Sequence, residues 1–549
     1  MLNCQEEVLQ ITKELVNTSS IVNTSGEKNM ATNIYNRLGA LSYFVSNPEH
    51  LVMSRTVNDE VERYNVLAFV KGTKDSSDDT VILMGHFDTV GIDDFAQLKD
   101  LSCNPDKLSI AYLSEKLPAN VEQHLKSGKW LFGRGVLDMK SGLAAHIYLL
   151  QHYAEHPEDL AGNLLLVAEC DEEDSSHGIL SALKILKEWK ETYHFNYVAA
   201  INADFVSPRY DGDENRYIYK GSVGKLLPSF FITGKETHVG SCFEGFDPNF
   251  LAAELTREID YNPLLSDKAY GETPAPPVSL KQTDLKPAYT VQTALSAFVY
   301  YNFLIHSWSP RDVLQKLRYH AEVAFKRALD TFTERYQAYC QLSGETYHPV
   351  PWTVRVFTYE EFHQLLVDQN GENYLRHMKE FTTDLLTDPS LDIRMYSARG
   401  VEEAWKFMKD KSPAIILFYS SLYSPRVEVT GKNAQEKRLI DTLEGAVAKM
   451  QPFYPNPIVT RNFFPYISDM SFVALSDDEA GIQAVSLNNP AWGTKHYVEY
   501  QDIRDINVPV ICIGPYGLDA HKKHERTEIA YSCEIVPNLI NEVIRDLLK

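Results

Sequence analysis

The chain has 549 residues, of which 44% are hydrophobic and 23% charged, and its formal net charge is −22. This length predicts two or more domains with a large core. The acidic balance argues against a nucleic-acid surface, which needs clustered Lys and Arg. It mildly favours cationic substrates through long-range steering, although solubility is the simpler explanation.

Targeting features are absent from the sequence pattern. No apolar stretch is long enough to cross a bilayer, and the first residues lack a basic and then apolar export segment. Seven cysteines are scattered without CxxC spacing. We therefore expect a cytoplasmic protein with reduced thiols and no membrane partner, in which no cysteine ligates a metal.

The first third of the chain alternates helical and strand-like patterns. Apolar periodicity predicts helices at residues 5–16, 142–153 and 181–189. Short apolar runs predict strands at residues 65–70, 80–84, 163–168 and 197–201. Strands that alternate with helices predict an α/β fold with a mostly parallel sheet.

The pattern changes after about Lys220. A strand at 226–233 is followed by helical periodicity at 249–259 and again across 291–339. The α/β pattern then resumes, with strands predicted at 352–357, 414–419 and 508–513 and helices at 401–408 and 537–548. We therefore predict a catalytic domain in two parts, residues 1–220 and 346–549, with an inserted α+β domain at 221–345.

Polar residues with metal-binding side chains follow or close several of the apolar runs. They are His86, Asp138, the acidic run from Asp171 to Asp174, and Asp204, with His524 in the loop beyond the last predicted strand. Because ligands bind at the carboxyl ends of strands in open α/β sheets, these residues can converge. Two imidazoles with carboxylates suit zinc or a similar ion, and Asp138 can bridge two such ions.

Two further features of this cluster fit hydrolysis. Asp88, two residues after His86, can accept the other ring N–H of that histidine and fix its tautomer. Glu172 and Glu173 are adjacent, so one can bind metal while the other takes a proton from water and passes it to a leaving amine.

Each motif taken singly also has an ordinary structural explanation. The His-x-Asp pattern at His86 occurs by chance in long chains, and the Asp171–Asp174 run fits a solvated helix start. Asp204 fits a helix N-cap, and His521 and His524 fit a basic surface turn. The conjunction of all of them in this order, mostly at strand ends, is much less expected by chance.

The residues in question resemble the M20 metallopeptidase family, also called the aminoacylase/carboxypeptidase/desuccinylase family. The matching segments are residues 85–90, 133–142, 171–173 and 524–528, and the GRGxxDxKxG segment is the most specific. The resemblance spans essentially the whole chain. It implies a zinc-exopeptidase-like catalytic domain, an inserted lid and dimerisation domain, and two Zn²⁺ (or Co²⁺ or Mn²⁺) ions per chain.

The resemblance also implies roles for single residues. His86 and Asp204 would hold one ion, Glu173 and His524 would hold the other, and Asp138 would bridge them, with Glu172 as the general base. His521 is set aside because Glu525, four residues after it, lacks the family's following apolar pair.

The inserted domain offers one more candidate catalytic residue. In dimeric members of the family a lid histidine reaches a neighbouring active site and helps to stabilise the oxyanion. His238 is the match here, with a purely structural role as the alternative. The resemblance therefore implies a homodimer through the lid domain.

The sequence departs from the family in its length and in an acidic, lysine-bearing insert near residues 93–129. With the segment from Ser20 to Glu27, these features resemble the bacterial arginine-utilisation branch. We predict a dinuclear amidohydrolase that cleaves a C–N bond in a small amino-acid derivative, for example an arginine-related one, or in a short peptide. The alternatives are a di- or tripeptidase and a metal-binding relative without catalysis.

Overall fold

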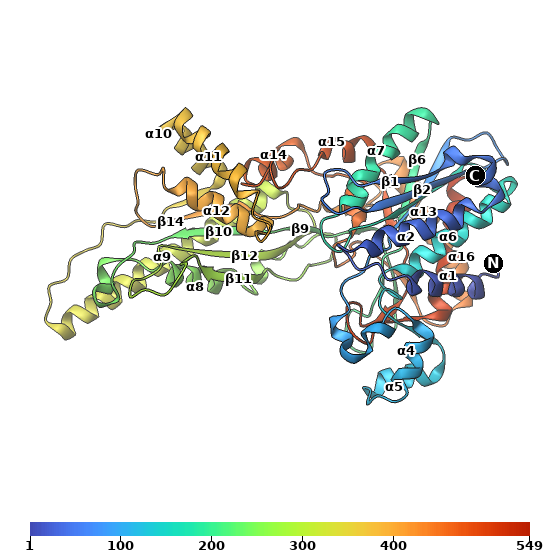
Figure 1. Ribbon diagram of the computed structural model, residues 1–549, viewed down its shortest axis with the longest axis horizontal. Coiled ribbons are helices and arrows are strands. Elements are labelled where there is room, and N and C mark those ends of the chain that lie inside the picture. Colours follow the sequence, from blue (N-terminus) through green and yellow to red (C-terminus); the bar gives the residue numbers. More distant parts are fainter. The chain divides into compact units, whose positions relative to one another are not determined.

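The computed structural model describes residues 1–549, which divide into two compact units (Figure 1). The first unit contains residues 1–222, 427–475 and 499–549, and the second contains residues 223–426 and 476–498. Each unit has a main sheet of its own.

An eight-stranded sheet forms the centre of the first unit, in the order β1-β2-β5-β3-β6-β17-β7-β16. The strands are β1 (Leu51–Arg55), β2 (Tyr64–Lys71), β3 (Asp79–His86), β5 (Asn163–Glu169), β6 (Asn196–Asn202), β7 (Arg216–Tyr219), β16 (Ile458–Arg461) and β17 (Val510–Cys512). The four adjacent strands β5, β3, β6 and β17 are parallel. The predicted α/β class with a mostly parallel sheet is therefore confirmed.

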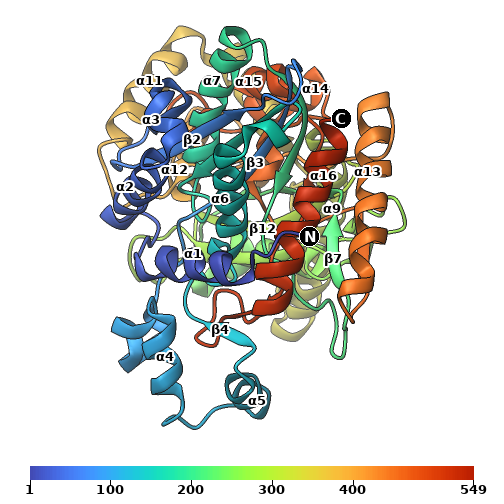
Figure 2. The ribbon, with the colours of Figure 1, turned by 90° about the vertical axis from the view of Figure 1, so that its right-hand side faces the viewer.

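Helices pack on this sheet and on one another. They are α1 (Gln5–Asn17), α2 (Ser25–Gly39), α3 (Ser42–Ser46), α6 (Lys140–Glu155), α7 (His177–Thr192), α13 (Ala434–Met450), α15 (Tyr500–Ile506) and α16 (Val536–Leu547). Figure 2 shows α6 in front of β2 and β3, with α1 and α16 nearby. Nearly all of α6 is buried, because it packs on the strands on one side and on α1 and α16 on the other.

A smaller layer of the first unit lies beside the main sheet. Here the strands β18 (Gly517–Leu518), β19 (Arg526–Glu528) and β4 (Trp130–Phe132) pair in that order. The chain between β3 and β4 contains the 3-10 segment η2 (Asp93–Leu101) and the helices α4 (Pro105–Tyr112) and α5 (Ala119–Ser127). These elements correspond to the insert that the sequence predicts near residues 93–129, and they enclose a small apolar cluster of their own.

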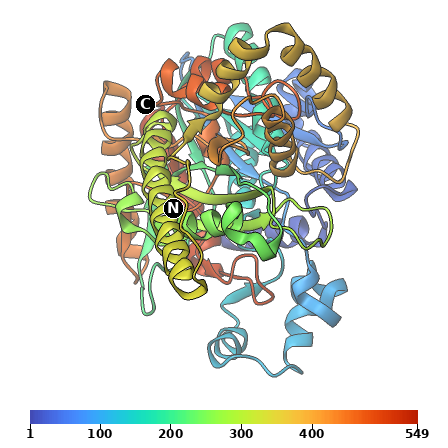
Figure 3. The same ribbon diagram turned by 90° about the vertical axis from the view of Figure 1, so that its left-hand side faces the viewer.

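The second unit has a sheet in the order β11-β12-β10-β14-β13, and β9 pairs with β12. Its strands are β9 (Gly224–Leu226), β10 (Pro228–Thr233), β11 (Val278–Asp284), β12 (Ser296–Ile305), β13 (Val356–Thr358) and β14 (Ala414–Tyr419). Its helices are α8 (Pro248–Ile259), α9 (Pro310–Ser343), α10 (Tyr359–Asn370), α11 (Glu372–Leu385), α12 (Ile393–Trp405) and α14 (Glu479–Leu487). The long α9, yellow in Figure 3, packs against α8.

One predicted helical stretch is wrong in its first part. Residues 291–309 contain the ten-residue strand β12, and the helix starts only at Pro310. Residues 297–300 pair on both sides, with β10 and β11, and Phe303 to Ile305 pair with β9. Ser309 then forms a capping box with Asp312, which starts α9.

The second unit is larger than the inserted domain predicted at 221–345. Residues 346–426 also belong to it, because β13 and β14 extend its sheet and the helices α10 to α12 share its core. The sequence from Ala414 to Tyr419 reads as a buried strand of the catalytic sheet, but it pairs with β10. None of the helices combines the length and apolar character that a bilayer crossing requires.

Candidate functional site

The carboxyl ends of the parallel strands bring the predicted residues together. His86 is the last residue of β3 and lies opposite Glu169, the last residue of β5. Glu172 and Glu173 lie in the turn after β5, and Asp204 lies two residues after the end of β6. Adjacent parallel strands end at one edge of the sheet, so these side chains share that edge.

Asp138 lies between two imidazole rings. One of its carboxylate oxygens, Oδ1, is 3.2 Å from Nε2 of His86, and the other, Oδ2, is 2.9 Å from Nε2 of His521. The same His521 nitrogen is 3.0 Å from Oε1 of Glu173. His86, Asp138 and Glu173 present ligand atoms that all lie within 4.8 Å of one another. This arrangement suits a carboxylate that bridges two ions.

His521 takes the position that the resemblance assigns to His524. The ring of His524 lies edge-on against Tyr112, with the ring centroids 5.6 Å apart. The loop turns at His521, whose φ of 62° is left-handed, and this turn directs its ring toward Glu173. The ring beside Asp138 and Glu173 is thus that of His521, and the assignment of His524 as a ligand stays a prediction.

The glutamates that come four residues after each of the two histidines have different partners. Glu525, four residues after His521, is buried and accepts the backbone N–H groups of Leu137 (3.1 Å) and Asp138 (3.3 Å). Glu528, four residues after His524, pairs instead with Arg216 at 2.7 Å. The loop that carries His521 is thus tied to the backbone of Asp138.

Asp88 supports both halves of the cluster. Its Oδ1 and Oδ2 accept the backbone N–H groups of Glu172 (3.2 Å) and Glu173 (3.1 Å). Nδ1 of His86 lies 3.1 Å from the main-chain oxygen of Asp88 and 3.5 Å from its Oδ1. With Nδ1 held in this way, Nε2 of His86 faces Asp138.

Replacing Asp88 by asparagine is expected to lower kcat/KM by roughly 10- to 100-fold, because an amide cannot accept both backbone N–H groups and its NH₂ group repels one of them. The measurement is steady-state kinetics with metal content determined on the same samples. The exposed Asp75→Asn is the control and should keep wild-type kinetics. Unchanged kinetics in the Asp88 variant would mean that its three contacts do not position the site.

Several acidic groups are buried close together at this edge of the sheet, where their charged forms are unfavourable without a positive partner. Burial raises the pKa of Glu172 well above its usual value, and it raises the pKa of Asp204 to about 7, with further repulsion from Asp138. Burial lowers the pKa of His521, but Asp138 and Glu173 outweigh this effect and raise it to about 10. Carboxylates and imidazoles crowded in this way fit a site for divalent cations, which would neutralise the acids.

A second group of possible ligands, Asp59, Asp171 and His177, lies nearby in the chain. Here the buried Arg63 already supplies a positive charge, 2.6 Å from Asp59, 2.8 Å from Asp171 and 3.1 Å from Glu27. We therefore interpret this group as an ion-pair network that holds the turn before Glu172. Sequence reasoning missed Arg63, since a lone arginine before a strand has no distinctive spacing.

The glycine-rich segment before Asp138 has a steric explanation. Gly135 has a φ of 78°, and a Cβ at this position would lie 2.7 Å from Cγ2 of Thr89. Arg134, which lies between Gly133 and Gly135, pairs with Glu525 at 2.7 Å and with Asp94 at 2.8 Å. The motif thus brings the Asp138 turn, the His521 loop and the insert into contact.

His238 lies in the second unit, where the short η4 (Val239–Glu244) begins. Its side chain is exposed, and Nδ1 accepts the backbone N–H of Gly240 at 3.0 Å. Its role at a neighbouring active site stays a prediction.

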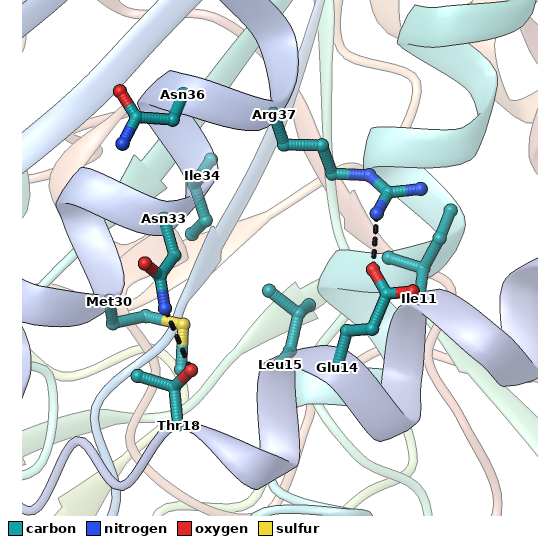
Figure 4. Close-up of a pocket in the computed structure, with 9 residues that line it drawn as sticks. All are labelled: Ile11, Glu14, Leu15, Thr18, Met30, Asn33, Ile34, Asn36 and Arg37. Atoms are coloured by element: carbon teal, nitrogen blue, oxygen red, sulfur yellow. Dashed lines mark hydrogen bonds and ion pairs between the residues drawn. The ribbon is translucent and has the colours of Figure 1, made fainter.

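A pocket of about 230 Å³ lies between α1 and α2, away from this cluster (Figure 4). Ile11, Leu15, Met30 and Ile34 supply its apolar lining. Its charged residues Glu14 and Arg37 pair with each other. The pocket therefore lacks the converging acidic and imidazole groups of the strand-end cluster.

The fold and the cluster together define an α/β protein with acidic and imidazole side chains at one edge of its parallel sheet. The model of the peptidase family M20/M25/M40 matches residues 82–541, and the chain belongs to this family. It is 35% identical to Protein RocB of Bacillus subtilis (strain 168) over 548 residues, which cover 100% of this chain and 96% of RocB.

Two further proteins are similar to this chain over nearly its whole length. The chain is 32% identical over 549 residues to the uncharacterized protein YqjN of Bacillus subtilis (strain 168), covering 99% of this chain and 97% of YqjN. The crystal structure of aminopeptidase PepT from Bacillus cereus superposes with a TM-score of 0.52 at 11% identity, covering 99% of each chain. This structural likeness concerns the fold alone.

Proposed function

We propose that this protein is a dinuclear metal-dependent hydrolase of an amide or other C–N bond in a small amino-acid derivative or a short peptide. The observation that carries the proposal is the position of Asp138, whose two carboxylate oxygens face the imidazoles of His86 and His521. Family membership and the buried acidic cluster support it.

The ligands would divide between the two ions through Asp138. His86 and Asp204 would hold one ion, and Glu173 and His521 would hold the other. Imidazole and carboxylate donors suit Zn²⁺, Co²⁺ or Mn²⁺. When bound, such ions supply Lewis acidity toward the amide carbonyl and the attacking water.

Glu172 would move the proton in this reaction. Its side chain is mostly buried and lies 3.8 Å from Nε2 of His86, at the edge of the ligand cluster. Burial raises its pKa, which brings the carboxylate closer to the range in which it can both accept and release a proton. Glu172 would take a proton from the attacking water and deliver it to the nitrogen of the leaving amine.

The substrate class is the finer part of the proposal. The length, the insert and the N-terminal segment resemble the arginine-utilisation branch, and the full-length similarity to RocB fits that branch. We therefore propose an arginine-related derivative as the first substrate to test. A cationic substrate is also compatible with the net charge of −22.

The test combines metal analysis with a substrate screen. Protein loaded with zinc or cobalt should contain about two ions per chain and hydrolyse a member of a panel of N-acyl amino acids, arginine derivatives and dipeptides. Chelator treatment should abolish this activity, and the metal should restore it. At a metal concentration 100-fold above the Kd of each site, each bound ion should also stabilise the fold by about 2.7 kcal/mol in thermal unfolding.

The outcomes of this test separate the alternatives. Activity confined to unblocked di- and tripeptides would make the protein a peptidase rather than an amidohydrolase of blocked amino acids. Two bound ions without turnover on any class would favour the non-catalytic metal-binding relative. Protein that retains no ion after incubation with zinc or cobalt would contradict the dinuclear site.

A further inference from the structure

The proposed ligand His521 lies on a loop with little support of its own. The loop spans residues 519–525 and joins the two-residue strand β18 to the three-residue strand β19. The side chain of His521 is 47% exposed, so core packing does not fix its position. Within the loop the turns close with two backbone hydrogen bonds, from Lys522 to Asp519 and from Glu525 to Lys522.

The insert between β3 and β4 contacts this loop directly. The hydroxyl of Tyr112, the last residue of α4, donates a hydrogen bond to the main-chain oxygen of Lys523. The Tyr112 ring lies against His524, and Glu115 pairs with the Lys523 ammonium at 3.7 Å. These contacts hold Lys523 and His524, which come two and three residues after His521 in the loop.

Tyr112 is itself held firmly in place. It is fully buried in the apolar cluster of the insert, which contains Phe95, Leu108, Tyr112, Val121 and Phe132. Its ring packs edge-on against Phe132 of β4, at 5.8 Å between ring centroids. Since β4 pairs with β19, the cluster and the strand that ends the His521 loop form one body.

Two arginines add further links between the insert and the loop. Arg526 donates from Nε to Nδ1 of His124 on α5, at 2.9 Å. Arg134 joins Asp94 of the insert to Glu525 of the loop. Glu525 also accepts the backbone N–H of Asp138. The insert is therefore connected both to Asp138 and to the loop that carries His521.

We propose that the insert of residues 93–129 is a positioning element that holds His521 at its distance from Asp138 and Glu173, with Tyr112 as its principal contact. The proposal rests on the proposed function, since His521 is a metal ligand only there. It assigns His524 a packing role against Tyr112. Tyr112 is accordingly a positioning residue that acts through the loop.

The test compares Tyr112→Phe with Tyr153→Phe in the full-length protein. Both remove a hydroxyl from a buried tyrosine of the first unit, and Tyr153 donates to Asn541 at 2.6 Å, far from the loop in sequence. The first readout is amide hydrogen exchange of the peptide covering residues 519–525 in metal-free protein. The second is zinc affinity by calorimetry, and the third is the separation of kcat from KM.

Loss of one hydrogen bond to the loop should speed exchange of this peptide by roughly threefold to tenfold in Tyr112→Phe. The affinity for zinc at the weaker site should fall by a similar factor, and kcat should fall while KM stays constant. Tyr153→Phe should leave all three unchanged. Glu115→Gln, which weakens an exposed pair, should change exchange less than Tyr112→Phe.

Two results would overturn the proposal. Exchange of residues 519–525 that is the same in Tyr112→Phe and wild type would show that the insert does not hold the loop. A rise in KM with unchanged exchange would make Tyr112 a substrate contact. Failure of the proposed function is distinguishable, because wild type would then bind no zinc while the exchange readout of metal-free protein still decides the role of the insert.

Discussion

Replacing Glu172 by glutamine is expected to lower kcat by roughly 10²- to 10⁴-fold while the protein keeps its bound metal. The amide has nearly the same shape as the carboxylate but cannot take a proton from water at neutral pH. The five proposed ligands do not include this side chain, so metal content should stay at the wild-type value. Steady-state kinetics and elemental analysis of the same preparation measure both quantities.

The control for this variant is Glu436→Gln. Glu436 is also a buried glutamate of the first unit, where it accepts three backbone N–H groups near the start of α13. Its replacement should reduce stability and leave kcat near wild type. Near-normal turnover of the Glu172 variant would remove this residue from the role of general base, and loss of metal would assign it to the ligands.

Replacing His521 by alanine is expected to lower kcat/KM by at least about 100-fold and to weaken binding of one of the two ions. The variant removes the imidazole nitrogen that lies 2.9 Å from Asp138 and 3.0 Å from Glu173. A direct ligand should cost at least as much as the roughly 10- to 100-fold loss that follows the removal of its supporting partners. Calorimetric titration of the metal-free protein with zinc measures the affinity.

His524→Ala is the matched control, since it removes an imidazole from the same loop, three residues away. It should lower kcat/KM by less than about tenfold, because only the packing of His524 against Tyr112 is lost. Circular dichroism should show both variants folded. If His524→Ala lost the ion and His521→Ala kept it, the ligand assignment from the sequence resemblance would stand and the geometry-based one would fall.

Much of the fold could be predicted from the chain by local patterns. The apolar runs at residues 80–84 and 163–168 indicate buried strands, and these runs lie within β3 and β5. The predicted helix from Gln5 agrees with α1 within one residue. Such segments bury a continuous apolar surface, so the spacing of their apolar residues shows directly which positions lie in the core.

Other segments could not be assigned without their neighbours. The stretch before Pro310 has apolar residues at helical spacing, yet it becomes β12 because β10 and β11 pair with it on either side. The strand β14 looks like part of the catalytic sheet but completes the sheet of the second unit. Strand partners come from distant parts of the chain, and local propensity does not specify them.

The sequence by itself determined the chemical types at the site and most of their positions. The order of His86, Asp138, Glu172, Glu173 and Asp204, each near the end of an apolar run, is enough to predict a cluster at one edge of a parallel sheet. This prediction is possible because the carboxyl ends of adjacent parallel strands lie at the same edge of the sheet, so residues that follow those strands lie close together.

Only the tertiary structure decided which C-terminal histidine joins that cluster. His521 and His524 lie three residues apart on a loop without regular structure, so no periodicity distinguishes the directions of their rings. The direction is set by contacts with residues far away in the chain, namely Tyr112, Arg134 and the backbone of Asp138. Those contacts exist only once the insert and the loop have folded together.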